Sequence, residues 1–72
     1  MTAHDIRAVV SAYLLSSGTL GRREGEIFKR FNYLPREDIL NELQVLWEQE
    51  QVQRFTDEKK KHIWRATEKL NV

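Results

Sequence analysis

The apolar residues of this chain change their spacing once, and that change limits the folds that it can adopt. Ile39, Leu43 and Leu46 recur at intervals of four and three residues, which places them on one face of a helix. In residues 52–55 and again in 62–67, apolar and polar residues alternate instead, as they do in a half-buried β-strand. The sequence therefore predicts a helix that leads directly into a β-hairpin.

This helix is expected to span Pro35–Gln51. Its first residue suits the first turn of a helix, because the N–H that proline lacks would have had no partner there. Glu37 and Asp38 then place negative charge where the helix dipole favours it. The apolar face, with Leu40 and Trp47, is predicted to be buried. The opposite face carries polar and acidic side chains around one valine: Glu37, Asn41, Gln44, Val45 and Glu48.

Two further helices are predicted in the first half of the chain. Thr2 followed by Asp5 resembles a capping pair that starts a helix, and Gly18 is placed to end that helix in the left-handed conformation. A second helix is expected over Arg22–Phe31. Between them, Thr19–Gly21 is a candidate for one short strand that joins the hairpin.

The composition favours one small domain. The chain has 72 residues, of which 40% are apolar and 32% charged, and it has no cysteine. We therefore expect residues 1–72 to form a single α+β domain, three helices followed by a two-stranded hairpin. The absence of cysteine excludes disulfides and thiolate sites. No apolar run approaches the roughly 20 residues that span a bilayer. A location in the cytoplasm is expected, or in the nucleus of a eukaryote, with no role in a membrane.

The net charge of +1 conceals an uneven distribution. Residues 1–34 contain five basic and three acidic residues, residues 35–51 one basic and five acidic, and residues 52–72 six basic and three acidic. Positive charge therefore flanks an acidic central helix. Such asymmetry bears on binding partners more than on the fold.

The flanking basic side chains are candidates for contacts with phosphate groups. On the second helix they are Arg22, Arg23 and Lys29, and on the hairpin Arg54, Lys59, Lys60, Lys61 and Arg65. Asn41 and Gln44 on the central helix can pair bidentately with adenine in a DNA groove. Two other interpretations remain open. The three lysines can simply keep a turn soluble, and the acidic face with Val45 at its centre can suit a protein partner that has a basic, partly apolar groove.

The predicted order of elements resembles that of the winged helix-turn-helix family over nearly the whole chain, from Asp5 to Thr67. The most characteristic segments are LQVLWEQEQVQRF and HIWRAT. The resemblance implies that the hairpin is a wing, that the second helix crosses the DNA backbone and that the third enters the major groove. A tight turn, often with glycine, is usual in the family where this chain has Glu50-Gln51.

One subgroup of this family binds left-handed Z-form nucleic acids, and it is similar to this chain at several positions. They are Pro35-Arg36, Ile39, Leu43, Ile63-Trp64-Arg65 and Thr67. Arg36 would match a basic residue that contacts phosphate, and Trp64 the tryptophan of the wing. The chain departs from the asparagine, the tyrosine and the wing prolines of the subgroup at Leu40, Gln44, Lys61 and His62.

These patterns predict a small transcription regulator that binds double-stranded DNA through its third helix and basic wing. One alternative is a domain that docks on a protein through its acidic helix. A second is a Z-form binder, which the residues support less because key positions of that subgroup are not matched. His4 and His62 lack accompanying carboxylates at ligand spacing, so no metal is expected. Neither a cofactor nor an enzymatic activity is predicted. A homodimer would have to use the first helix or the edge of the wing.

Overall fold

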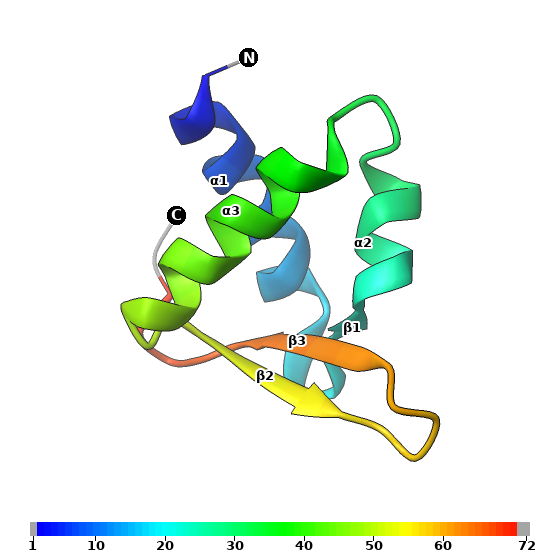
Figure 1. Cartoon of the computed structure of the whole chain (residues 1–72). Helices are drawn as coiled ribbons and strands as arrows, with labels where there is room; N and C mark the ends of the chain where they lie inside the picture. The colour runs from blue at the N-terminus through cyan, green and yellow to red at the C-terminus, as the bar shows by residue number, and fades with distance from the viewer. Residues whose placement is uncertain (1, 71–72) are drawn as a thin grey trace.

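The computed structural model describes residues 2–70, which form three α-helices and a three-stranded antiparallel sheet (Figure 1). Three residues of the predicted domain 1–72, namely Met1, Asn71 and Val72, lie outside the described part. None of the described helices has the length and apolar character needed to cross a membrane. The α+β class and the three helices are confirmed. The elements are α1 (Ala3–Ser16), the 3-10 turn η1 (Gly18–Leu20), β1 (Arg22–Arg23), α2 (Glu24–Arg30), α3 (Arg36–Glu48), β2 (Val52–Thr56) and β3 (His62–Ala66).

Helix α1 begins and ends as its sequence predicts. The backbone N–H of Asp5 donates to the Thr2 hydroxyl at 3.2 Å, and the Asp5 carboxylate accepts from the Thr2 backbone N–H at 3.2 Å. Each side chain thus satisfies a backbone donor that has no partner within the helix. After the helix, Gly18 adopts a φ of 66°, which is favourable only for residues without a bulky Cβ.

The short strand lies at Arg22–Arg23, so the prediction that placed it at Thr19–Gly21 was wrong. Gly21, with φ 71° and ψ −167°, redirects the chain after η1. β1 then pairs with β3, with Arg22 opposite Trp64, and the strand order in the sheet is β1-β3-β2. The strand forms because β3, far along the chain, lies beside it and pairs with it. The local sequence around Arg22 does not indicate such a partner.

This pairing also shortens the second helix. The prediction of Arg22–Phe31 was wrong at both ends, because α2 covers only Glu24–Arg30. Arg23 keeps an extended backbone with φ −68° and ψ 147°, and Phe31 closes the helix with a non-helical backbone. The sheet therefore has three strands where a two-stranded hairpin was predicted. The two strands of the hairpin itself lie where they were expected.

Helix α3 is shorter than predicted at its C-terminal end, and Pro35 precedes it as the N-cap. The helix stops because Glu50 adopts a left-handed φ of 60°. The N–H of Gln51 donates to the carbonyl of Leu46 at 2.9 Å, and that of Glu50 to the carbonyl of Trp47 at 3.0 Å. This is the Schellman arrangement, which commonly uses glycine at the left-handed position. The tight turn into β2 is thus made here by a glutamate.

The core lies where α1 and α3 cross above the sheet (Figure 1). Ile39, Leu43 and Leu46 of α3 are almost completely buried, as predicted. Leu40 and Trp47 are 38% and 37% exposed, so their predicted burial was wrong. Both lie on the flank of the helix rather than at the centre of its apolar face. The rest of the core comes from Ile6, Val10, Leu14, Ile27, Phe31, Val52, Trp64 and Leu70.

One acidic residue of α3 is buried, which the sequence pattern did not indicate. Glu42 is 6% exposed and accepts a hydrogen bond from the Nε of Arg7 in α1 at 2.8 Å. A buried carboxylate needs such a partner because its desolvation is costly. The pair therefore ties α1 to α3 and removes one negative charge from the exposed surface of α3.

Candidate functional site

The two faces of the β2–β3 hairpin carry different arginines. Arg54 and Trp64 are paired across the strands. The guanidinium of Arg54 lies 4.2 Å from the ring centroid of Trp47 and 5.9 Å from that of Trp64. The two indole rings meet edge to face, with centroids 6.2 Å apart. Arg54 is thus held against α3 by two aromatic rings, an arrangement that keeps its charge in a fixed place.

Arg65 lies on the other face, because successive side chains of a strand point to opposite sides of the sheet. Its guanidinium lies 4.9 Å from the ring centroid of Phe55 and donates to the side chain of Gln53. It also borders a groove with Leu15 and Thr19, at the end of α1 and in η1. Arg54 and Arg65, which were predicted to contact the same polyanion, are therefore on opposite sides of the hairpin.

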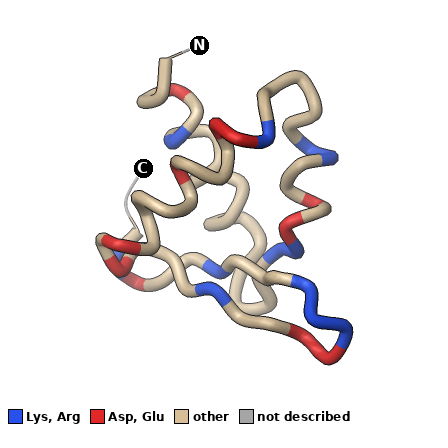
Figure 2. The backbone as a smooth tube through the Cα atoms, viewed as in Figure 1, with Lys and Arg blue, Asp and Glu red and all other residues tan. Residues whose placement is uncertain are grey.

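A cleft of about 540 Å³ separates the start of α2 from the hairpin loop. One side is formed by Lys59, Lys60, Lys61 and His62, and the other by Arg23, Glu24, Gly25, Glu26 and Phe28. The guanidinium of Arg36, at the start of α3, lies 5.1 Å from the Phe28 ring centroid. The cleft therefore brings together basic residues of β1 and the hairpin loop, which are distant in the sequence, whereas Arg36 contacts Phe28 without lining the cleft. Figure 2 shows positive charge in the hairpin loop, beside its acidic residues, and near the start of α2, while the start of α3 lies beyond the other end of α2.

The carboxylates near this cleft are engaged in contacts within the protein. Glu24 accepts a hydrogen bond from Nε1 of Trp64 at 3.2 Å. Glu26 accepts from Arg22 at 3.3 Å and from the backbone N–H of Arg23 at 3.4 Å. Asp57 lies 3.3 Å from Nε of Arg23. These acids reduce the positive charge of the cleft, but each also fixes an element that forms it.

Most basic side chains of the cleft and hairpin are not used in ion pairs. Within residues 2–70, the basic residues that form ion pairs with carboxylates are Arg7, Arg22, Arg23 and Lys69. The predicted phosphate-binding residues outside that set are Lys29, Arg36, Arg54, Lys59, Lys60, Lys61 and Arg65. Their positive charge is thus available to an external anion. Arg22 and Arg23 are the exceptions among the predicted residues, and Arg22 also donates to Ser17 at 2.7 Å and stacks on Tyr13.

The polar candidates of α3 lie on its exposed surface, about one helical turn apart. Gln44 is exposed and donates to Glu48 at 3.3 Å. Asn41 is also exposed and borders a small cleft with Ala3 and Ile6 of α1. Val45 is only partly exposed. Gln44 is therefore the candidate that faces away from α1, while Asn41 lies toward it.

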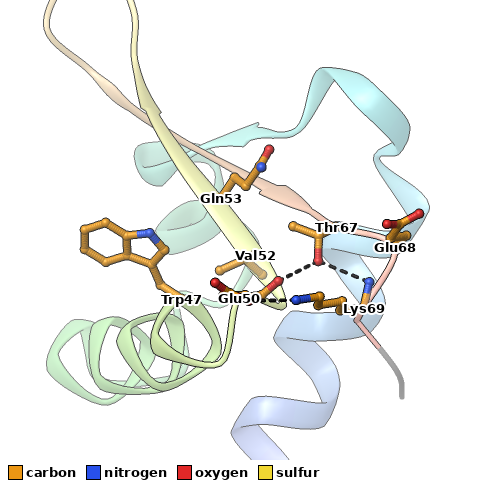
Figure 3. Close-up of a pocket in the computed structure, with 7 residues that line it drawn as sticks. All are labelled: Trp47, Glu50, Val52, Gln53, Thr67, Glu68 and Lys69. Atoms are coloured by element: carbon orange, nitrogen blue, oxygen red, sulfur yellow. Dashed lines mark hydrogen bonds and ion pairs between the residues drawn. The ribbon is translucent and has the colours of Figure 1, made fainter.

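A second cleft, of about 310 Å³, lies where α3 passes into β2 (Figure 3). The Glu50 backbone carbonyl accepts from the Thr67 hydroxyl at 2.8 Å, and the Glu50 carboxylate contacts Nζ of Lys69 at 2.6 Å. Lys69 lowers the pKa of Glu50 through this hydrogen bond and its charge. The cleft is surrounded by contacts that stabilise the left-handed turn at Glu50. We interpret it as a structural junction.

Replacing Glu50 by glycine should stabilise the protein by about 0.5 to 1 kcal/mol, because glycine adopts a left-handed φ without steric cost. The exposed ion pair with Lys69 would be lost, and such pairs contribute little. The Thr67 bond would persist because it uses the backbone carbonyl of residue 50. Urea unfolding measures the change. Lys69→Ala, which removes the ion pair alone, is the control, and a glycine variant less stable than the original protein would contradict the expectation.

Several residues of this site escaped the sequence patterns. The sequence patterns indicated no role for Asp57 or Phe28 at a binding site. Trp47 was predicted to be buried although it supports Arg54 at the surface. A local signal existed only for Asp57, since aspartate often bonds to the backbone two residues later in turns. The contacts of Phe28 and Trp47 depend on how helices and hairpin pack.

No family model, curated protein or solved structure matches this chain. In the described part of the chain, no three His, Asp or Glu side chains gather closely enough to hold a metal ion.

Proposed function

We propose that this chain is a winged-helix domain that binds nucleic acid, with double-stranded DNA as its ligand and transcription regulation as its role. The order of helix, strand, two helices and hairpin supports the winged-helix assignment, as does the pairing of β1 with β3. The binding surface comprises Arg36 at the start of α3, Arg54 on the hairpin and the three lysines of its loop.

The observation that carries this proposal is the position of Arg54. Its side chain lies over Trp47 of α3, so its charge sits between that helix and the hairpin. Arg36 lies over Phe28 beside the lysine-lined cleft. Arginine stacked on an aromatic ring has less conformational freedom to lose when it binds phosphate. Arg36 and Arg54 are therefore two fixed guanidinium groups near the two ends of α3, and the three lysines line the cleft beside α2.

On duplex DNA these basic groups would contact phosphates and orient α3 in the groove. Gln44 is the residue of α3 best placed to reach a base edge, because amides pair bidentately with adenine. Glu37 and Glu48 flank it and would disfavour close phosphates. The proposed contacts therefore lie at the ends and flank of α3 rather than along its whole exposed face.

A second candidate function is docking on a protein through α3. Its specific support is the exposed acidic face, where Glu37 and Glu48 form no ion pair within residues 2–70. The surface would comprise Glu37, Asn41, Gln44, Val45 and Glu48. A partner with a basic, partly apolar groove would complement it.

Fluorescence anisotropy of a labelled duplex at several salt concentrations tests the first proposal. Five phosphate contacts, from Arg36, Arg54 and the three lysines, predict a log–log slope of about −4.5, since each contributes about 0.9. Constant anisotropy at low salt, with protein up to high micromolar concentration, would overturn DNA binding and favour protein docking. Circular dichroism of an alternating GC duplex would invert if the protein bound the Z form. An unchanged B-form spectrum would exclude that form.

The two hairpin arginines provide a matched pair of variants. Arg54→Ala should weaken DNA binding by about 3- to 10-fold and lower the salt slope by about 1, as expected for one lost phosphate contact. Arg65→Ala removes the same charge from the opposite face and should change affinity less than twofold. Both arginines stack on an aromatic ring, so the two variants perturb the hairpin in a similar way. Equal losses in the two variants would contradict the proposed orientation.

A further inference from the structure

We propose that Asp57 is a positioning residue that attaches the lysine-bearing loop to β1 and holds it ready to bind a polyanion. This inference rests on the proposed nucleic-acid function and extends it to the loop between β2 and β3. Asp57 would not contact the ligand. It would act through the backbone of the loop and through Arg23.

The contacts of Asp57 organise the whole loop. Its Oδ1 accepts from the backbone N–H of Lys59 at 2.9 Å and from that of Lys61 at 2.8 Å. Its own backbone N–H donates to the Lys61 carbonyl at 2.9 Å, and its carbonyl accepts from the Lys60 N–H at 2.9 Å. One residue thus fixes the backbone of all three lysines.

The second oxygen of Asp57 connects this loop to the rest of the sheet. Oδ2 lies 3.3 Å from Nε of Arg23, and the Asp57 side chain is only 15% exposed. Arg23 is in β1, where it pairs with Ile63 of β3. The hydrogen bond from Lys61, together with that from Lys59 and the charge of Arg23, lowers the pKa of Asp57. The carboxylate therefore remains ionised, and able to hold these partners, at neutral pH.

The conformation of Lys60 is a separate observation in favour of a functional loop. Its φ of 61° lies in the left-handed region, which costs a residue with a Cβ roughly 1 kcal/mol or more. Glycine or asparagine would fit this position better in a turn that had only a structural role. Lysine keeps a third positive charge in the loop despite that cost.

Charge and loop organisation predict opposite effects when Asp57 is replaced. Loss of a negative charge beside three lysines should strengthen binding to a polyanion if the lysines act only through their charge. Loss of the loop bonds should weaken it, because an unordered loop must then be ordered during binding. The sign of the change therefore decides between the two models.

The test compares Asp57→Ala, Asp57→Asn and Glu58→Ala in the duplex-binding assay. Asp57→Ala should weaken binding by about 5- to 10-fold, a loss of roughly 1 kcal/mol as expected for reordering one or two loop residues. Asp57→Asn keeps an oxygen that can accept from Lys59 and Lys61 and loses only the charged contact with Arg23. It should bind more tightly than Asp57→Ala but less tightly than Glu58→Ala. Glu58→Ala removes the same charge from the exposed neighbour and should bind as tightly as the original protein or up to about threefold more tightly.

Backbone amide exchange, followed by NMR without ligand, gives a second readout. The amide protons of Lys59 and Lys61 should exchange at least about 10-fold faster in Asp57→Ala, because these amides donate to Asp57. Their exchange rates should not change in Glu58→Ala. If Asp57→Ala binds DNA as tightly as Glu58→Ala, the positioning role is overturned while DNA binding stands. If the unaltered protein binds no duplex, the proposed function fails and the positioning role fails with it. If Asp57→Ala does not fold, the affinities of Asp57→Asn and Glu58→Ala for the duplex are compared instead. Equal affinities would contradict a positioning role of Asp57 through Arg23.

Discussion

Gly21→Ala is expected to destabilise this protein by about 3 kcal/mol or more, combining backbone strain with a steric clash. Gly21 has φ 71° and ψ −167°, a region that is essentially restricted to glycine. A Cβ at this position would lie 2.6 Å from the backbone carbonyl oxygen of Trp64 and 3.2 Å from atoms of Ile63 and Arg65. Relief of this clash would require β1 to separate from β3. The loss would be large for a domain whose total stability is expected to be about 4 to 11 kcal/mol.

Urea unfolding and thermal denaturation measure this effect, and the other two glycines are controls within the same chain. Gly18→Ala meets no atom within 4 Å but keeps a φ of 66°, so it should cost only about 1 kcal/mol. Gly25→Ala lies in α2, also with open space, and should be neutral or stabilise by up to about 1 kcal/mol. Equal unfolding midpoints for Gly21→Ala and Gly18→Ala would show that β1–β3 pairing does not depend on this close approach.

Reversing the charges of Lys59, Lys60 and Lys61 to glutamate is expected to reduce DNA affinity by about 100-fold or more at low salt. Three proposed phosphate contacts would be replaced by repulsion, and the salt slope should fall by about 3 because each contact contributes about 0.9. The fold should persist, since the three side chains are exposed and Asp57 bonds to their backbone rather than to their ammonium groups.

Two controls separate a local contact from a general effect of net charge. Neutral glutamines at the three positions should give an intermediate affinity. Lys69→Gln removes a positive charge that already faces Glu50 at the far end of α3 and should leave binding nearly unchanged. Retention of full affinity by the triple glutamate variant, with an unchanged unfolding midpoint, would remove the hairpin loop from the proposed binding surface.

If the acidic face of α3 instead binds a protein, these variants would have no effect on that complex. Substitution of Glu37 and Glu48 by glutamine would then weaken it. The two surfaces share only Gln44, which none of these variants changes, so the same set of variants distinguishes the two functions once a ligand is in hand.

The sequence alone determined those features that depend on neighbouring residues. Thr2 and Asp5 form the predicted capping pair, Gly18 follows α1 in the left-handed conformation, and the hairpin strands occupy the predicted segments. The spacing of apolar residues, helix capping and turn formation each depend on a few neighbouring residues, so they can be predicted from a short stretch of sequence.

The tertiary structure decided what depends on distant partners. Arg22 and Arg23 became a strand because β3 lies beside them, and Glu42 is buried because Arg7 of α1 reaches it. The predicted set of basic residues was likewise divided, with Arg54 on the α3 side of the hairpin and Arg65 on the other. Charged residues can be counted in a sequence, but the side of the sheet on which each side chain lies depends on strand register and packing. The physical reason is that these contacts join segments far apart along the chain, and the residues next to each segment do not indicate its partner.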